Sequence, residues 1–73
     1  MGSEREHNDT LYELLGGSVR EQRKKARVTQ ERLAKAVGVA RASVANIELG
    51  NQRVSIELLY AIGRALGRDP RDL

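Results

Sequence analysis

Apolar residues recur at the three- and four-residue steps of a helix, rather than at the alternate positions of a strand. The first stretch has an apolar stripe made of Leu11, Leu15, Val19 and Ala26, with Leu14 beside it. This stripe predicts a helix from about Thr10 to about Ala26. Gly16 and Gly17 interrupt it, each at a cost of about 1 kcal/mol against alanine, so a break leaving residues 10–15 as a separate turn is also open.

Capping residues predict the next two helices. Thr29 is suited to accept a hydrogen bond from the first turn of a helix over about 30–37. Gly38 follows the last periodic residue, where a chain commonly takes the left-handed conformation that glycine tolerates. A helix over about 41–49 then buries Val44 and Ile47 and ends at Gly50.

The C-terminal part predicts one long and one short helix. Ser55 caps a helix that ends at Gly67 and carries the stripe Leu58, Leu59, Ile62 and Leu66. Asp69 is suited to cap a short fifth helix, and Pro70 is suited to the first position of that helix. Because no strand pattern or repeat competes, the fold class is expected to be all-α, a compact bundle of about five short helices.

The composition limits the function classes. Residues 1–9 are polar without a period and are predicted to be a flexible tail, which leaves 10–73 as one domain; the sole histidine, His7, lies in that tail. The 73-residue chain has no cysteine, and it has no long apolar run or cleavable leader, so we expect a cytoplasmic protein with no membrane partner. We expect no enzyme, cofactor or metal site, because no phosphate-binding glycine loop or paired carboxylates occur.

The charge is uneven along the chain. Residues 18–53 hold nine basic against three acidic side chains, whereas residues 1–17 hold one against four. A basic middle favours an anionic partner, with a solvated Lys/Arg-rich helix face as the equal alternative. Two tyrosines are the only aromatic residues, which makes stacking on single-stranded bases less suitable than binding to double-stranded DNA.

The segment TQERLAKAVGVARASVANIE, residues 29–48, has a helix-turn-helix pattern. Two short helices that cross steeply need a small residue, Ala34, at their closest approach and Gly38 at the bend. Leu33, Val37, Val39, Val44 and Ile47 supply the apolar positions around them. An ordinary helical hairpin is the alternative interpretation.

The stretches TQERLAKAVGV, NIELGNQR and LLYAIGRALG resemble the XRE family, the lambda repressor and Cro type of DNA-binding domain. The resemblance covers about residues 15–73. It implies five short helices with the third, 41–49, in the major groove of double-stranded DNA. It further implies a transcription regulator, a repressor or autoregulator that acts as a homodimer on a palindromic operator and is nucleoid-associated when bound.

The resemblance also implies roles for individual residues. It assigns base reading to Arg41, Ala42, Ser43 and Asn46, and phosphate binding to Gln30, Asn51 and Arg53. Arg41 can donate two parallel hydrogen bonds to guanine, and a phosphate contact is its alternative. Arg23 and Glu48 match a buried or half-buried salt bridge between the first and third helices.

The sequence departs from the family pattern at Arg27, Ala40, Gly63 and Arg68. Leu11, Tyr12, Leu14 and Tyr60 are assigned to the core in preference to a partner surface. A phage-type repressor, a restriction-modification controller, an antitoxin and the DNA-binding part of a longer regulator all remain open. The alternative from another class is a protein-interaction adaptor or antitoxin module, bound to a toxin or effector domain, in which DNA binding is secondary or lost.

Overall fold

The computed structural model describes residues 2–68, which form four helices and no strand. These are α1 (Gly2–Lys25), α2 (Gln30–Val37), α3 (Arg41–Leu49) and α4 (Ile56–Ala65). The predicted all-α class is confirmed, with four helices in place of about five. The short fifth helix predicted from Asp69 lies outside the described residues.

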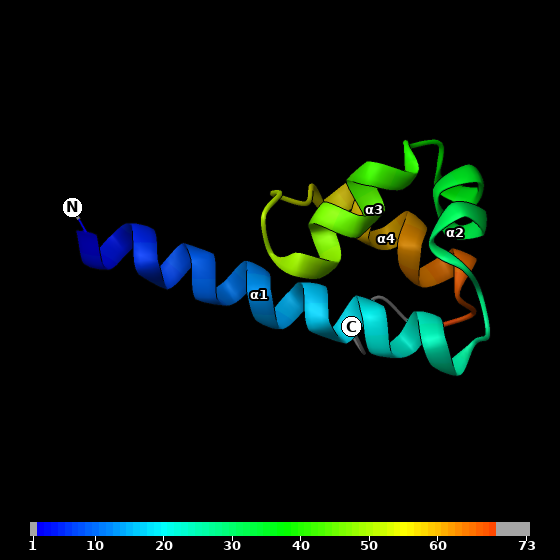
Figure 1. Cartoon of the computed structure of the whole chain (residues 1–73), viewed down its shortest axis with the longest axis horizontal. Helices are drawn as coiled ribbons and strands as arrows, with labels where there is room; N and C mark the ends of the chain where they lie inside the picture. Colours follow the sequence, from blue (N-terminus) through cyan, green and yellow to red (C-terminus); the bar gives the residue numbers. More distant parts are fainter. Residues whose placement is uncertain (1, 69–73) are drawn as a thin grey trace.

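Helix α1 begins at Gly2, eight residues before the start predicted at about Thr10, so that boundary was placed too late. The flexibility expected of residues 1–9 stays a prediction. The N-terminal part of α1 extends beyond the other helices (Figure 1). Extending an existing helix adds one hydrogen bond per ordered residue, which is far easier than nucleating a new helix.

The break left open at Gly16 and Gly17 does not occur, and Gly16 lies where α1 crosses the C-terminal end of α3. A Cβ atom at Gly16 would collide with the carbonyl oxygen of Ile47 and would lie 2.9 Å from that of Glu48. Gly17 is exposed, with open space around the same position. The two glycines therefore differ in role, since only Gly16 allows the close helix contact.

The turns between α2, α3 and α4 follow the predicted capping residues. The Thr29 hydroxyl accepts a hydrogen bond from the Arg32 backbone N–H at 3.1 Å, and Gly38 ends α2 at φ 78°. Gly50 ends α3 at φ 79°, and an added Cβ there would lie 2.7 Å from the Glu13 Cα. Gly50 is thus required both by its backbone conformation and by its contact with α1.

Three departures from the family pattern are visible in the structure. Arg27 adopts φ 58°, a left-handed conformation that costs a residue with a Cβ about 1–2 kcal/mol. Ala40 begins α3 without a side-chain cap, and Arg68 is exposed. These are local costs, and the helices around them form as predicted.

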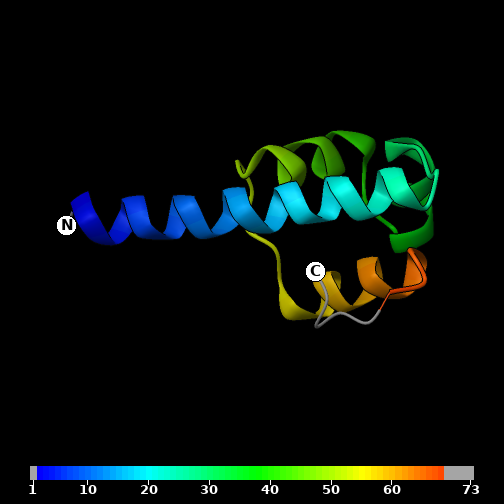
Figure 2. The ribbon, with the colours of Figure 1, turned by 90° about the horizontal axis from the view of Figure 1, so that it is seen from below.

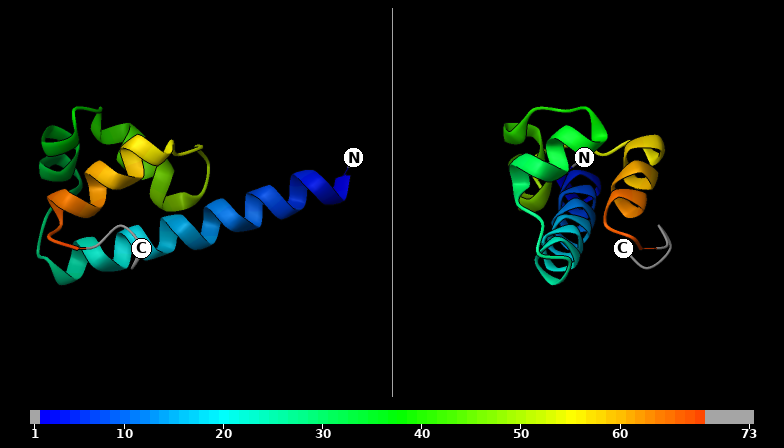
Figure 3. Two further views of the ribbon diagram at one scale, coloured as in Figure 1. Left: turned by 180° about the vertical axis from the view of Figure 1, so that it is seen from behind. Right: turned by 90° about the vertical axis from the view of Figure 1, so that its right-hand side faces the viewer.

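The core lies where α1 meets the other three helices. Helices α2 and α3 lie on one side of α1 and α4 on another (Figures 2 and 3). The buried apolar side chains come from all four helices: Val19, Leu33, Ala34, Val44, Ile47, Ile62 and Leu66. Val37 and Val39 pack against this cluster from the turn between α2 and α3. The core thereby fixes the angle between these two helices.

Several apolar residues predicted to lie in the core are on the surface. Leu11, Leu14 and Tyr60 are exposed, and Tyr12 is half-buried. In α1 the contact with α3 is made at Gly16, and Leu14, two residues earlier, points to roughly the opposite side of the helix. The prediction failed because leucine spacing allows more than one buried face, and the glycine contact selects between them.

We expect Gly16→Ala to destabilise the fold and Gly17→Ala to stabilise it. At Gly17 alanine should add about 0.5–1 kcal/mol through helix propensity. At Gly16 the new methyl group meets backbone atoms that cannot move aside, and such overpacking typically costs about 1–3 kcal/mol. Urea denaturation of both variants measures the difference, and equal shifts in stability would contradict the assigned helix contact.

Candidate nucleic-acid interface

The ion pair between Arg23 and Glu48 is present and connects α1 to α3. Arg23 Nε donates to Glu48 Oε2 at 2.6 Å, and Nη2 donates to Oε1 at 3.0 Å. The remaining guanidinium nitrogen, Nη1, donates to the Val28 carbonyl oxygen at 2.9 Å. The guanidinium therefore ties α1 both to α3 and to the turn that leads into α2.

This pair is largely shielded from water, with side-chain exposures of 11% for Arg23 and 2% for Glu48. The hydrogen bond to Glu48 raises the pKa of Arg23, against the opposing effect of burial. The guanidinium thus keeps its charge, which the buried carboxylate needs. A bidentate arginine–carboxylate pair has good geometry for offsetting desolvation.

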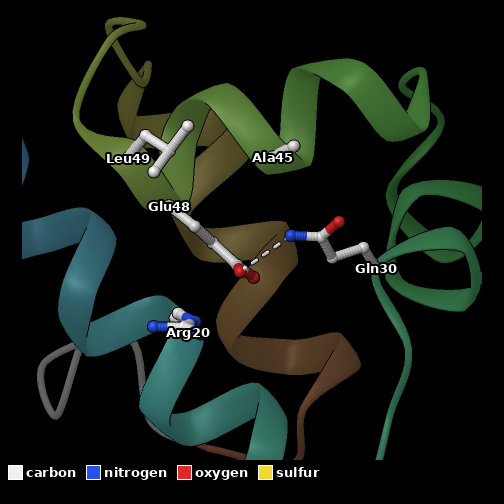
Figure 4. A pocket seen from close by; sticks show the side chains of 5 residues that line it. All are labelled: Arg20, Gln30, Ala45, Glu48 and Leu49. Carbon is white, nitrogen blue, oxygen red and sulfur yellow. Dashed lines mark hydrogen bonds between the residues drawn. The ribbon is translucent and has the colours of Figure 1, made fainter.

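Gln30, the first residue of α2, forms hydrogen bonds on both sides of its amide. Its Nε2 donates to Glu48 Oε1 at 3.1 Å, shown by the dashed line in Figure 4. Its Oε1 accepts from Arg41 Nη1 at 3.2 Å. Sequence reasoning assigned Gln30 to phosphate binding and found neither of these contacts, because they depend on how the helices cross.

The predicted base-reading residues differ in exposure. Arg41, Ala42 and Asn46 are exposed on α3, whereas Ser43 is half-buried. Val44 and Ile47 face the core. The opposite, outward side of α3 therefore carries residues 42, 45, 46 and 49, which lie three or four positions apart along the helix. Arg41 lies at the edge of that face, beside Gln30.

Two residues on the outward side of α3 were missed from the sequence. Leu49 is 66% exposed although it is apolar, and Ala45 is half-buried. Both line an open hollow of about 280 Å³ with Arg20, Gln30 and Glu48 (Figure 4). The spacing of Ala42, Ala45 and Leu49 follows one side of a helix. Since Ala42 was already assigned to the DNA-facing side, this spacing could have indicated Ala45 and Leu49 as well.

The predicted phosphate-binding residues lie in two places. Gln30 is at the N-terminal end of α2, and Asn51 and Arg53 are exposed in the loop between α3 and α4. The Asn51 backbone N–H donates to the Asn46 carbonyl oxygen at 2.9 Å, which holds this loop against the end of α3. Gln30 therefore contacts α3 directly, and the loop with Asn51 and Arg53 follows the C-terminal end of that helix.

Residues 2–68 contain neither a cluster of metal ligands nor a membrane-spanning helix. In that part of the chain no three His, Cys, Asp or Glu side chains are grouped closely enough for a metal ion. None of the helices there has both the length and the apolar character needed to cross a membrane.

Residues 19–73 match the model of a family described as helix-turn-helix. The chain belongs to the XRE-type helix-turn-helix family. It is 45% identical over 51 residues to an uncharacterised helix-turn-helix-type transcriptional regulator from Methanothermobacter thermautotrophicus. The matched segment covers 70% of this chain and 74% of that protein. The predicted resemblance is thus confirmed.

Two solved structures have the same fold as this chain. The clp gene regulator ClgR from Corynebacterium glutamicum superposes with a TM-score of 0.84 at 37% identity, over 85% of this chain and 66% of that chain. The restriction-modification controller protein C.AhdI from Aeromonas hydrophila superposes with a TM-score of 0.83 at 30% identity, over 86% of this chain and 96% of that chain. The first is named a gene regulator and the second a controller protein.

Removing the buried carboxylate should strongly destabilise this helix-turn-helix domain. We expect Glu48→Ala to cost about 3–5 kcal/mol, because it leaves the Arg23 guanidinium without its partner in a shielded site. The matched control is Glu21→Ala, whose exposed pair with Lys25 spans 3.4 Å and should contribute less than about 0.5 kcal/mol. Thermal melts that place both variants close to wild type would reject the structural role of Glu48.

Proposed function

We propose that this protein is a transcription regulator that binds double-stranded DNA at a specific sequence and places α3 in the major groove. The single observation that carries the proposal is the outward side of α3, where Arg41 and Asn46 are exposed while Val44 and Ile47 hold the helix in the core. An α-helix presented in this way fits the width of the major groove.

The chemistry of that side supports base reading by particular residues. Arg41 is the proposed reader of a guanine, through two donors to O6 and N7. Asn46 is suited to adenine or a phosphate, and Ala42 to the methyl group of thymine. Ser43 has a lesser proposed part because it is half-buried.

The flanking residues supply proposed phosphate contacts. Asn51 and Arg53 lie in the exposed loop after α3, and the first turn of α2 offers backbone N–H groups next to Gln30. The excess of basic residues in 18–53 adds attraction that does not depend on base sequence. Phosphate contacts of this kind fix the register, and the α3 side chains select the bases.

The proposed biological role is that of a repressor or autoregulator in the cytoplasm, bound as a homodimer to a palindromic operator. The likeness to C.AhdI, named a restriction-modification controller, and to ClgR, named a gene regulator, supports such a role. A single domain reads only a half-site, so pairing two copies increases both affinity and selectivity. No catalytic residue or cofactor is part of this proposal.

Two arginine variants test the proposed DNA-binding surface. Arg41→Ala should cost about 1–3 kcal/mol on the preferred duplex and relax selectivity at one base pair. Arg53→Ala should weaken binding to every duplex alike and lower the salt slope by about 1, because it removes one phosphate contact. Fluorescence anisotropy titrations on duplexes selected from a random pool, at several salt concentrations, measure both effects.

Two outcomes would contradict the proposal. Equal losses for the two variants on every duplex would remove the division into base-reading and phosphate-binding residues. Weak duplex binding by the wild-type chain, insensitive to salt, would instead favour an adaptor that keeps the fold without reading DNA.

Dimerisation gives a separate prediction about operator spacing. Two α3 helices related by a two-fold axis should contact half-sites about one helical turn, or 34 Å, apart. Inserting about five base pairs between the half-sites should abolish cooperative binding, since it turns one half-site to the far side of the duplex. Sedimentation of the free and bound protein gives the stoichiometry, and one protein per operator at saturation would refute the homodimer.

A further inference from the structure

Two exposed leucines lie on a side of α1 that faces away from α3. Leu11 is 57% exposed and Leu14 is 69% exposed. Leu14 points to roughly the opposite side of α1 from Gly16, which contacts α3, and Leu11 lies three positions before Leu14 on the same side. The first half of α1 extends past the other helices, which leaves this side open to another molecule (Figures 1 and 2).

Gly17 continues this side of α1, three positions after Leu14. It is exposed, and a Cβ atom there would have open space around it. Glycine weakens a helix relative to alanine, and no contact within the described residues requires glycine at this position. The surface of α1 therefore has two projecting apolar side chains followed by a shallow gap.

The two halves of α1 have opposite charge. Residues 2–13 hold four acidic residues and one basic residue, and residues 14–25 hold four basic residues and one acidic residue. Most of the basic residues are exposed, and Arg23, which binds Glu48, is the exception. A helix with this distribution is complementary to an antiparallel copy of itself, because each acidic half then lies beside a basic half.

An antiparallel pair of α1 helices also brings the leucines and the gap together. When Leu14 meets the partner's Leu14 at the two-fold axis, Leu11 of each copy lies opposite Gly17 of the other, three residues or about 4.5 Å from the axis. The Leu11 side chain then fills the space left open at Gly17. The apolar contact thus lies near the middle of α1, with the charged halves on either side.

The other exposed apolar residues are less suited to a second copy. On α4, Tyr60 is already in contact with Arg64, whose guanidinium lies 5.8 Å from the centre of the ring. Ile56 is the first residue of α4, where the helix only begins. Leu49 lines the hollow beside Arg20, on the side of α3 that is proposed to face DNA. The surface of α1 combines neighbouring exposed leucines with complementary charge.

We propose that two copies of this chain associate through antiparallel α1 helices, in which Leu11 and Leu14 of each copy pack against Gly17 and Leu14 of the other. This inference gives the homodimer a contact surface, so it rests on the proposed function only for the existence of a dimer. It requires no DNA and is tested on the protein alone. Because the apolar area is small, we expect a dimer of micromolar affinity that salt weakens by screening the charges.

Single cysteines test the register, because the chain has no cysteine of its own. Leu14→Cys places a thiol at the two-fold axis, where two copies should form a disulfide under mild oxidation. Leu11→Cys and Gly17→Cys should each cross-link slowly alone and join each other when the two variants are mixed. Ile56→Cys, 83% exposed on α4 before substitution, is the matched control and should run as a monomer on a non-reducing gel.

Sedimentation equilibrium at low and high salt measures the association itself. Leu14→Glu should raise the dissociation constant by at least about tenfold, because it places two carboxylates at the axis. Gly17→Ala should also weaken association, since its methyl group fills the gap that Leu11 needs, while thermal melts at low protein concentration show a more stable fold. Ile56→Glu is the control and should associate like wild type.

Three results would overturn the inference. A wild-type chain that stays monomeric at low salt has no such contact. Cross-linking of Ile56→Cys as fast as that of Leu14→Cys would remove the evidence for α1 as the contact. Association unchanged by Leu14→Glu, in a variant whose melt shows an intact fold, would place the contact elsewhere. These results do not decide whether the protein reads DNA, which the duplex titrations measure separately, and a loss of base preference there would leave the α1 contact standing.

Discussion

The arrangement of the first three helices depends on one shielded ion pair. A carboxylate as deeply buried as Glu48 is costly unless it is neutralised and fully hydrogen-bonded. Arg23 meets this need through Nε and Nη2, and its Nη1 holds the Val28 carbonyl oxygen in the turn before α2. The same contact therefore sets α3 against α1 and fixes where α2 begins. A helix-turn-helix needs that constraint, because its recognition helix must stand at a defined angle to its support.

The buried ion pair shares an oxygen with the contact that holds Gln30. Glu48 Oε1 accepts from Arg23 and from Gln30, so the oxygen that closes the buried pair also holds the first residue of α2. Replacing the pair by apolar residues of similar volume could preserve the fold, as buried ion pairs elsewhere often permit. It would also remove the acceptor of the Gln30 hydrogen bond. The ion pair of Arg23 and Glu48 thus connects α1 to α3 in the core and also holds the Gln30 amide.

Much of the fold could be predicted from local chemistry, whereas the side-chain network could not. Thr29, Gly38, Gly50 and Ser55 predicted the ends of α2, α3 and α4 because caps and left-handed turns depend on the residues themselves. The family resemblance supplied the Arg23–Glu48 pair and the recognition helix. The bonds from Gln30 to Glu48 and Arg41 depend on how individual side chains meet across α2 and α3, whereas the pattern of Ala34 and Gly38 predicts only that these helices cross.

The errors in α1 have a common physical cause. Helix propensity predicts that Gly16 destabilises α1. The absence of a side chain at Gly16, however, allows the α3 backbone to contact α1. That contact fixes the rotation of α1 and leaves Leu11 and Leu14 on the surface, although their spacing suits a buried stripe. The rotation of a helix about its own axis depends on tertiary contacts. Where two backbones touch, the smallest residue selects the buried face, and the leucines lie on the remaining faces.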